Sequence, residues 1–546
     1  MRVNEAVVDR LVAAGVETVF GIPGKQTLPL NETIDARADV RFVVSRHETA
    51  VSHAAWGYAE TSGRMAATCV VPGPGDMNAM NGLKNALNDC TPLLHLSVET
   101  DPHLRGGDAI HETPPDTYDG VVKANRTAET PASVVPTIDR AIETARTPPT
   151  GPVRVGIPKS FLGAEATVTG TETTGERRRA APVEALDVAA DRLAGADRPV
   201  VVAGGGVRTA DASDALLSVA TRLGAPVVTT YKGKGVVPED HPLSAGVLCG
   251  GASADLRALL ADADAALAVG TDLDAVATGG FEASLPDALV HVTLHPDDLD
   301  VGYDPAVGLV CDARVACAHL DDALADRGVE ENGDGRARAV READAARLDP
   351  LCERTDPLTS VAALAAVRDA LPRDAVVSAD AGGFRIWSLV SFPAYGPRSY
   401  VTTGSWATMG TGLPAAMGAA LANPDRPAVA LTGDGGLLMC VHELHTAASE
   451  GIPVTVVVFS NADYGIISEE AERRFDYDRT AFGWAASPLD LVTVAEGMGV
   501  PADRAETPEA VRSAVEDSLD APGPRLVEVP VDPTEPQASE WMRAER

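Results

Sequence analysis

The stretch AVALTGDGGLLMCVHELHTAASEGIPVTVVVFSNADYGII (residues 428–467) predicts a strand, a Gly-Asp-Gly turn, a helix and a second strand that ends at an asparagine. Short apolar runs at 428–432 and 454–459 favour the two strands, and helical spacing of apolar residues over 437–448 favours the helix. The carboxyl ends of parallel strands open on the same edge of a sheet. We therefore expect the aspartate of the turn and the final asparagine to lie close together.

The turn carries residue types that suit a phosphate and a metal ion. Gly433, Gly435 and Gly436 allow a sharp turn and expose N–H groups at a helix N-terminus, where a phosphate is stabilised. The carboxylate of Asp434 and the side-chain amide of Asn461 offer hard oxygen ligands for Mg²⁺, which bridges to diphosphate oxygens. The alternative is an ordinary βαβ crossover with a glycine-rich turn.

A second candidate lies far upstream, where a short apolar strand at 42–46 ends in Arg-His-Glu and a helical sequence follows. Glu48 therefore stands at the start of a helix and beside a strand end. One interpretation is a first-turn acid that the helix dipole favours. The other is a carboxylate that exchanges protons with a bound group, a role that contributes about 10²–10⁴-fold to a reaction.

These motifs resemble the thiamine-diphosphate superfamily of acetolactate synthase, pyruvate oxidase and benzoylformate decarboxylase, and most closely the acetolactate synthase large subunit. The order of the motifs is specific for the superfamily and much less specific for the reaction. The matching segments are VFGIPG (19–24), RHETAVSHAAWGYAETSGR (46–64), PGPGDMNAMNGLKNALNDCTPLL (72–94), GPVRVGIPK (151–159), RPVVVAGGGV (198–207), EDHPLSAGVL (239–248), TMGTGLPAAMGAALANPD (408–425) and the Gly-Asp-Gly unit.

The resemblance implies thiamine diphosphate and Mg²⁺ as cofactors. Glu48 would hydrogen-bond the pyrimidine ring nitrogen and so favour the imine that deprotonates the thiazolium carbon. The resemblance places Met409 as a wedge between the two cofactor rings. Plain core packing is the alternative for this residue. The other implied contacts are Mg²⁺ with the side chains of Asp434 and Asn461 and the Asp463 carbonyl, the diphosphate with the amides of Gly433, Gly435 and Gly436, and the exocyclic amine with the Ala407 carbonyl.

Two residues near the expected reacting carbon depart from acetolactate synthase. Ile110-His111-Glu112 stands where that family usually carries Phe-Gln-Glu. Decarboxylases of the superfamily often use histidine there as a proton relay, because histidine exchanges protons near neutral pH. A solvent-exposed loop histidine is the alternative for His111. Lys25 replaces the glycine of a GxPGG turn, where a cation could hold a substrate carboxylate or a second acidic group.

Other departures concern FAD and the acceptor substrate. The positions that match the FAD-binding arginines of acetolactate synthase are Pro149, Asp272 and Val276. This argues against tight FAD binding, because the FAD diphosphate loses its charge-assisted partners. The tryptophan with which that family selects its acceptor 2-oxo acid is replaced near Glu470, and GGGV at 204–207 is not a dinucleotide fingerprint.

By resemblance, a small 2-oxo acid loses CO₂ on the coenzyme, and the resulting enamine is protonated or joins a second carbonyl. Acetolactate formation from two pyruvates is the first expectation. Simple 2-oxo acid decarboxylation is the alternative, favoured by His111 and by the missing tryptophan. Two further interpretations stay open: a flavin- or NAD-dependent oxidoreductase of the same fold, and a coenzyme-binding subunit without activity in which Glu48 is idle.

The alternation of apolar strands with helical patterns predicts an α/β fold of three doubly wound domains with mainly parallel sheets. We expect a pyrimidine-binding domain at 1–162, a central domain at 183–328 and a diphosphate- and Mg-binding domain at 357–531. Residues 163–182 and 328–356 are expected to be linkers. The expected strands are 17–20, 41–44, 66–71, 93–97 and 153–156, then 200–203, 227–230, 265–269 and 290–294, then 375–378, 428–432, 454–459 and 525–529.

Composition limits the partners and the compartment. The 79 acidic and 45 basic residues give a net charge of −34, which argues against nucleic acid and anionic membranes as partners. The acids are spread along the chain as in proteins adapted to high cytoplasmic salt, so we expect the fold to loosen at low salt. No apolar run is long enough for a membrane span, and the helical pattern that follows Met1 leads us to expect no signal peptide. The seven scattered cysteines fit free thiols in a reducing cytoplasm.

The resemblance also implies a homodimer or homotetramer with active sites at the subunit interface, because the first domain of one subunit and the third of another share each coenzyme in that superfamily. Only six residues are lysines. For Lys84 and Lys232, which lie beside motif segments, a functional role and a plain surface role remain equally open.

Overall fold

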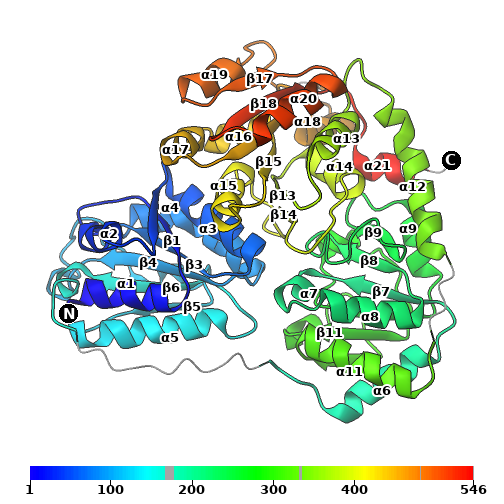
Figure 1. Cartoon of the computed structure of the whole chain (residues 1–546), viewed down its shortest axis with the longest axis horizontal. Helices are drawn as coiled ribbons and strands as arrows, with labels where there is room; N and C mark the ends of the chain where they lie inside the picture. Colours follow the sequence, from blue (N-terminus) through cyan, green and yellow to red (C-terminus); the bar gives the residue numbers. More distant parts are fainter. Residues whose placement is uncertain (167–177, 331–334, 480, 545–546) are drawn as a thin grey trace.

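The computed structural model describes residues 1–166, 178–330, 335–479 and 481–544, so the expected linker at 163–182 lies partly outside the described residues. The described chain forms three six-stranded sheets, and the strands of each sheet pair in parallel. Figure 1 shows one sheet in each of three lobes, with helices on both faces. The predicted α/β fold of three parallel-sheet domains is confirmed.

The first sheet has the strand order β2-β1-β3-β4-β6-β5. β3 and β4 are buried along their whole length, as expected for parallel strands covered on both faces. The elements are α1 (Val3–Ala13), β1 (Thr18–Gly21), α2 (Leu28–Asp35), β2 (Arg41–Val44), α3 (Glu48–Ser62), β3 (Ala66–Val70), α4 (Pro74–Asn88), β4 (Leu93–Glu99), β5 (Ala124–Thr127), α5 (Val134–Arg146) and β6 (Val153–Pro158).

The middle sheet has the order β12-β11-β10-β7-β8-β9. Its central strands β7 and β10 are also buried throughout. The elements are α6 (Val183–Ala194), β7 (Pro199–Ala203), α7 (Gly205–Thr209), α8 (Ser213–Leu223), β8 (Val227–Thr230), β9 (Ser244–Leu248), α9 (Ala254–Ala261), β10 (Ala265–Val269), α10 (Ala275–Thr278), β11 (Leu289–Thr293), β12 (Val307–Val310) and α11 (Ala313–Asp326).

The third sheet has the order β14-β13-β15-β16-β18-β17. Along the chain, β13 is followed first by β14 on one side of it and then by β15 on the other side. The carboxyl ends of β13 and β15 therefore lie at a topological switch point. The elements are α12 (Arg336–Cys352), α13 (Ser360–Ala370), β13 (Val376–Ala379), α14 (Gly383–Ser391), β14 (Tyr400–Thr402), α15 (Gly412–Ala422), β15 (Ala428–Gly433), α16 (Asp434–Cys440), α17 (Glu443–Glu450), β16 (Val454–Ser460), α18 (Gly465–Arg474), α19 (Leu491–Gly497), β17 (Ala502–Arg504), α20 (Pro508–Leu519), β18 (Arg525–Pro530) and α21 (Ala538–Arg543).

The structure differs from the sequence-based expectation in three helical segments. The helix expected at 437–448 is two helices, α16 and α17, because the chain turns at 441–442 through short i to i+3 bonds such as Leu444 N to Val441 O (3.1 Å). The expected linker at 328–356 contains α12, which packs on the middle domain through an ion pair of Arg347 with Asp255 (2.8 Å). The polar tail contains α21, whose Trp541 donates to the Arg347 carbonyl (2.8 Å).

The first and third domains are joined where α3 crosses α15. A Cβ added at Gly57 of α3 would collide with the Ala415 carbonyl oxygen, and one added at Gly418 of α15 would collide with that of Ala54. The two glycines therefore let the helix backbones touch. Figure 1 shows α15 lying against α3, between the two sheets.

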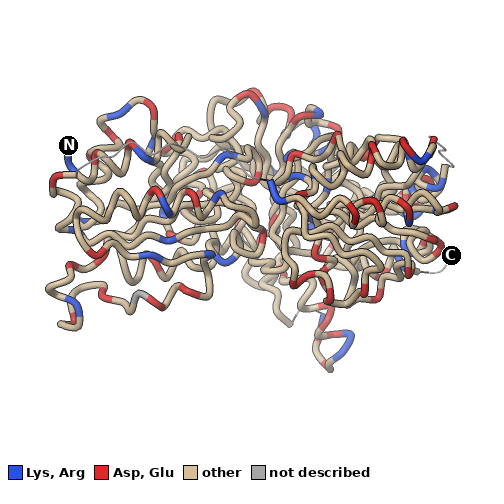
Figure 2. Tube along the Cα trace, turned by 90° about the horizontal axis from the view of Figure 1, so that it is seen from below, with Lys and Arg blue, Asp and Glu red and all other residues tan. Residues whose placement is uncertain are grey.

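Figure 2 shows acidic residues spread along the whole length of the drawn chain, with basic residues scattered among them. All seven cysteines are free thiols. Within the described residues, every helix is too short or too polar to cross a lipid bilayer.

Candidate active site

The Gly-Asp-Gly turn and the segment after β16 meet at the carboxyl edge of the third sheet. β15 and β16 pair in register with Gly433 opposite Phe459, so both strands end at the same level. One carboxylate oxygen of Asp434 accepts the backbone N–H groups of Asn461 (3.2 Å) and Ala462 (2.7 Å). Asp434 and Asn461 are therefore neighbours, although a helix pair and a strand separate them along the chain.

The glycines of the turn form a cradle that a larger residue would fill. A Cβ added at Gly435 would lie 2.7 Å from the Tyr464 ring, and one at Gly436 would lie 2.8 Å from Thr432 Oγ1. α16 begins at Asp434, so the N–H groups of its first turn have no backbone carbonyl partner within the helix. The bare backbone and these donors suit a diphosphate group.

The donor set also fits Mg²⁺. The Asp434 carboxylate accepts three backbone N–H bonds, the third from Gly435 (2.9 Å), and a carboxylate has about four lone-pair sites. Asn461 Oδ1 accepts one bond, from the Asp463 N–H (3.2 Å), and keeps a second lone pair. Burial raises the pKa of Asp434 to about 6, an effect that the three N–H bonds oppose and that a bound cation would reverse.

A buried carboxylate that the sequence did not single out, Asp380, joins this turn to the next loop. Its Oδ2 accepts Thr432 Oγ1 (2.9 Å) and the Gly410 N–H (3.2 Å), and burial raises its pKa. The loop held in this way carries two predicted site residues: Ala407, with a left-handed φ of 45°, and Met409, which is half-buried and lies outside the buried core.

Glu48 lies at the first position of α3, in the first domain, and is half-buried. Asn78 Nδ2 donates to its Oε2 at 3.0 Å. A Cβ added at Gly75 would lie 3.2 Å from its Oε1, so the carboxylate rests against the start of α4.

The third domain holds the strand end from which Glu48 projects. The N–H groups of Arg46 and His47 donate to Glu443 Oε1 at 3.0 and 2.9 Å, and Thr446 Oγ1 donates to Glu443 Oε2 at 2.6 Å. Glu443 opens α17 and is fully buried, and its burial raises the pKa of the carboxyl group. The break between α16 and α17 therefore places the Glu443 carboxylate in contact with the first domain.

His111 is half-buried and lines a cavity of about 250 Å³ beside the start of α4. Its backbone is left-handed (φ 66°), and a Cβ added at Gly73 would lie 2.7 Å from its carbonyl oxygen. Its Nδ1 lies 3.4 Å from Gln26 Nε2. The neighbouring Lys25 is exposed in the same turn as Gln26.

The predicted site residues thus form two groups. Glu48 and His111 flank the Gly73–Gly75 turn of the first domain, whereas Asp434, Asn461 and the loop with Met409 gather on the third domain. In the described part of this single chain, no hydrogen bond or ion pair connects the two groups.

Three parallel-sheet domains, a glycine cradle with a hard-ligand pair on the third and an acid at a helix start on the first define an enzyme that binds a diphosphate coenzyme. The chain belongs to the thiamine pyrophosphate enzyme family. Residues 1–119 match the N-terminal TPP binding domain of these enzymes, residues 186–320 the central domain and residues 380–529 the C-terminal TPP binding domain.

Relatives with different named activities cover most of the chain. A probable acetolactate synthase large subunit of Methanocaldococcus jannaschii is 30% identical over 98% of this chain and 93% of its own. A probable 2-ketoarginine decarboxylase of Pseudomonas aeruginosa is 34% identical over 86% of this chain and 83% of its own. The crystal structure of benzoylformate decarboxylase from Polynucleobacter necessarius shares the fold, with a TM-score of 0.86 at 22% identity over 98% of this chain and 99% of that one.

The residues at the positions expected to contact FAD do not form an anion site. Asp272 is exposed, and partial desolvation of its carboxyl group together with the neighbouring Asp274 and Asp298 raises its pKa to about 6. Val276 is 43% exposed on α10. A group of acids repels a diphosphate, so these residues do not fit the FAD of acetolactate synthase.

Asp380, Glu443 and Gln26 were not predicted from the sequence. Asp380 follows β13 directly and stands in Asp-Ala-Gly-Gly (380–383), so, like Asp434, it is an aspartate at a strand end before a pair of glycines, and a signal for it existed. Glu443 lay inside an expected continuous helix, and Gln26 acquires its contact only through a loop more than 80 residues away, at His111. Neither residue had a sequence signal of its own.

Proposed function

We propose that this protein is a Mg²⁺- and thiamine-diphosphate-dependent enzyme that decarboxylates a 2-oxo acid. The observation that carries the proposal is the Asp434–Asn461 pair beside the glycine cradle. Bound there, thiamine diphosphate supplies a nucleophilic carbon and a charged ring that takes up the electrons released with CO₂. The 2-oxo acid substrate is supported by the relatives named as acetolactate synthase and 2-ketoarginine decarboxylase.

The residues of this chain bind and orient the coenzyme and move protons. Glu48 holds a proton at the pyrimidine ring nitrogen, a task for which its half-buried carboxylate beside Asn78 is suited. The other proposed roles are Mg²⁺ binding by the side chains of Asp434 and Asn461 and by the Asp463 carbonyl, diphosphate binding by the N–H groups of Gly433, Gly435 and Gly436, and contacts of the Ala407 carbonyl and the Met409 side chain with the coenzyme rings.

The first proposed outcome is carboligation, in which the product carbon joins a second 2-oxo acid, as in acetolactate synthesis. It is supported by an acetolactate synthase relative that matches 98% of the chain. The second is release of a free aldehyde, which His111 favours, since this half-buried histidine lines a cavity and can deliver a proton there. Lys25, in the turn that contacts His111 through Gln26, binds the substrate carboxylate.

We further propose that two chains share each site, because Glu48 and Asp434 make no contact with one another within one chain. Apolar side chains that a partner could bury surround both groups: Met77 (50% exposed), Ile110 (75%), Trp406 (44%) and Met439 (50%). Large exposed apolar side chains beside a site support an interaction surface there. Pro149, Asp272 and Val276, at the positions of the FAD-binding arginines, carry no positive charge for a diphosphate, so we propose that the enzyme works without FAD.

The test is an assay of purified protein in high salt with Mg²⁺, thiamine diphosphate and a panel of 2-oxo acids. Release of CO₂ is expected, with acetoin after acidification if carboligation occurs and free aldehyde if protonation occurs. Glu48→Gln should abolish either product while the protein still binds the coenzyme.

Absence of CO₂ release from every 2-oxo acid, in protein that binds thiamine diphosphate, would instead support a coenzyme-binding subunit without activity. A flavin absorbance spectrum in the purified protein would contradict the proposed FAD-independent reaction and favour an oxidoreductase.

A further inference from the structure

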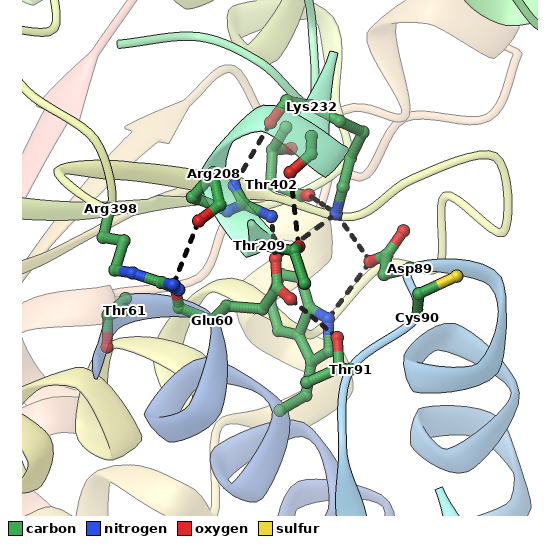
Figure 3. A network of polar contacts seen from close by, with 12 residues as sticks. Glu60, Thr61, Asp89, Cys90, Thr91, Arg208, Thr209, Lys232, Arg398 and Thr402 are labelled. Atoms are coloured by element: carbon green, nitrogen blue, oxygen red, sulfur yellow. Dashed lines mark hydrogen bonds and ion pairs between the residues drawn. The ribbon is translucent and has the colours of Figure 1, made fainter. Parts of the chain in front are cut away.

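Buried charges from all three domains form a cluster where the domains meet, and we call these five side chains the junction cluster (Figure 3). Their side chains are 3–18% exposed, so solvent screens them little. The five are Glu60 in α3 and Asp89 after α4, Arg208 in α7 and Lys232 after β8, and Arg398 before β14.

Lys232 lies at the centre of the junction cluster. Its Nζ is 2.7 Å from Asp89 Oδ2 and 3.7 Å from Glu60 Oε2, both in the first domain. It also donates to the Thr402 carbonyl at the end of β14 in the third domain (3.2 Å) and lies over the Trp56 ring at 5.3 Å. One middle-domain cation therefore binds both other domains, and the surface role left open by the sequence does not apply.

Asp89, the main partner of Lys232, contacts the loop that carries Ala407 and Met409. A Cβ added at Gly404 would collide with Asp89 Oδ1, so the carboxylate packs on the bare backbone at the start of this loop. Besides Lys232, Asp89 accepts a bond from Trp56 Nε1 (3.1 Å). Without Lys232, the buried Asp89 carboxylate would contact the loop with only the neutral Trp56 N–H as a hydrogen-bond donor.

The first domain continues this contact along the loop. Asn88 Nδ2 donates to Ser405 Oγ at 3.3 Å, and Asn81 Nδ2 donates to Thr408 Oγ1 at 3.0 Å. Because positions seven apart lie on one face of a helix, α4 presents a row of polar groups to the loop, and Asp89 stands at its end. The position of the loop therefore depends on where the first domain sits, which the junction cluster determines.

We propose that Lys232 is a positioning residue for thiamine diphosphate: by holding Asp89 and the Thr402 carbonyl, it sets the loop 403–409 in its coenzyme-binding conformation. The inference rests on the proposed function, since the contact of this loop with the coenzyme rings is part of that function. Lys232 itself touches neither substrate nor coenzyme. Its removal should weaken coenzyme binding more than it affects the substrate.

Lys234 provides a matched control two residues away. It is 1% exposed, pairs with both oxygens of Glu239 (2.7 and 2.8 Å) and donates to the Leu389 carbonyl (3.1 Å), but it has no contact with Asp89 or the loop. Lys234→Met therefore breaks an equally buried ion pair without disturbing the loop.

The experiment is titration of thiamine diphosphate, in the presence of Mg²⁺, into the full-length protein and its variants by calorimetry. Lys232→Met should bind about tenfold more weakly, and its kcat at saturating coenzyme and its KM for the 2-oxo acid should stay near those of the parent. Lys234→Met should lose thermal stability to a similar degree but keep its affinity for the coenzyme. The double variant Lys232→Met/Asp89→Asn should regain part of the affinity, because no unpaired Asp89 carboxylate remains although the bond to the Thr402 carbonyl is still missing.

Asp89→Asn, which preserves shape, is a second single variant should Lys232→Met fail to fold, and it too should weaken coenzyme binding. Unchanged coenzyme affinity in both Lys232→Met and Asp89→Asn would overturn the inference, as would an equal loss of affinity in Lys234→Met. If instead the parent protein bound no thiamine diphosphate, the proposed function itself would fail, a result distinct from a failure of Lys232 alone.

Discussion

The two groups of site residues differ in how firmly one chain holds them. On the third domain, Asp434 accepts three backbone N–H bonds and an added Cβ at Gly435 or Gly436 would clash, so contacts within one chain already form the cradle. On the first domain, Glu48 has one side-chain donor, and the loop of His111 exposes Ile110 by 75%. In the proposed enzyme, the diphosphate end of the coenzyme would contact a surface formed within one chain, and the pyrimidine end would contact a surface that a second chain completes.

We therefore expect the third-domain group to determine coenzyme binding and the first-domain group to determine the rate of the reaction. Preorganised donors favour binding of the diphosphate and metal, whereas the groups that move protons lie in the less constrained region. Variants of the third-domain group should therefore lose the coenzyme, and variants of the first-domain group should keep it and lose turnover.

The largest expected effect is that of Glu48→Gln, which should lower kcat by about 10²–10⁴-fold because the amide cannot exchange a proton with the pyrimidine. Coenzyme affinity measured by calorimetry should remain within a few-fold of the parent. A large loss of coenzyme affinity in this variant would remove the contrast between the two groups.

Asp434→Asn should act on binding instead. Loss of the negative ligand is expected to weaken Mg²⁺-dependent coenzyme binding by about 100-fold, since even residues behind a metal ligand contribute 10–100-fold. Titration of Mg²⁺ at saturating thiamine diphosphate measures the effect. Asp425→Asn, a change to an exposed acid of the same domain, is the control and should leave the titration unchanged.

The contributions of the two domains to the free energy of unfolding should also change with pH in opposite directions. His53 in α3 is fully buried, neither ring nitrogen has a partner within the described residues, and burial lowers its pKa to about 4. Since the unfolded chain takes up this proton near pH 6.5, the free energy of unfolding should fall as pH decreases from 6.5 to 4, by up to about 3 kcal/mol. Asp434, with its pKa raised to about 6, acts in the other direction in metal-free protein, which loses stability as pH rises through 6.

Urea unfolding of metal-free protein and of His53→Leu at several pH values between 5 and 7 measures the histidine contribution. The variant should show a smaller loss of stability towards pH 5. Parallel pH profiles for the two proteins would show that His53 is not the group responsible.

The smallest expected effect is that of Gly75→Ala. The added Cβ would lie 3.0 Å from Val71 Cγ2 and 3.2 Å from Glu48 Oε1. It should displace the carboxylate by a few tenths of an ångström, enough to lower kcat by about tenfold without changing metal binding. Gly120→Ala, where no atom lies within 4 Å of the new Cβ, is the matched control. Equal activity of both variants would mean that the placement of Glu48 tolerates more movement than the comparison implies.

The sequence predicted the central strands of each sheet because buried parallel strands require continuous apolar runs. The five strands it missed, β5, β9, β12, β14 and β17, all lie at sheet edges. An edge strand pairs on one side only and can be short and polar, as are β5, with no buried residue, and β17, whose three residues are half-buried or exposed. Pattern alone cannot separate such strands from loops.

The site was predictable to the same extent. Asp434 and Asn461 each follow a predicted strand, so their meeting followed from parallel topology. Asp380, Glu443 and Lys232 were not assigned, because in sequence a buried charge looks like an exposed one. Their partners come from other domains or distant strands, and only the folded chain brings those together.

The glycine crossing of α3 and α15 bears on how this protein can be recombined with its relatives. Gly57 and Gly418 face the backbones of Ala415 and Ala54, so a bulkier residue on either helix is tolerated only if the opposite helix has changed to match. A chimera that takes its first 162 residues from one parent should therefore inherit 412–422 from the same parent. A breakpoint in a linker between the domains would separate α3 from α15, two segments that have to be exchanged together.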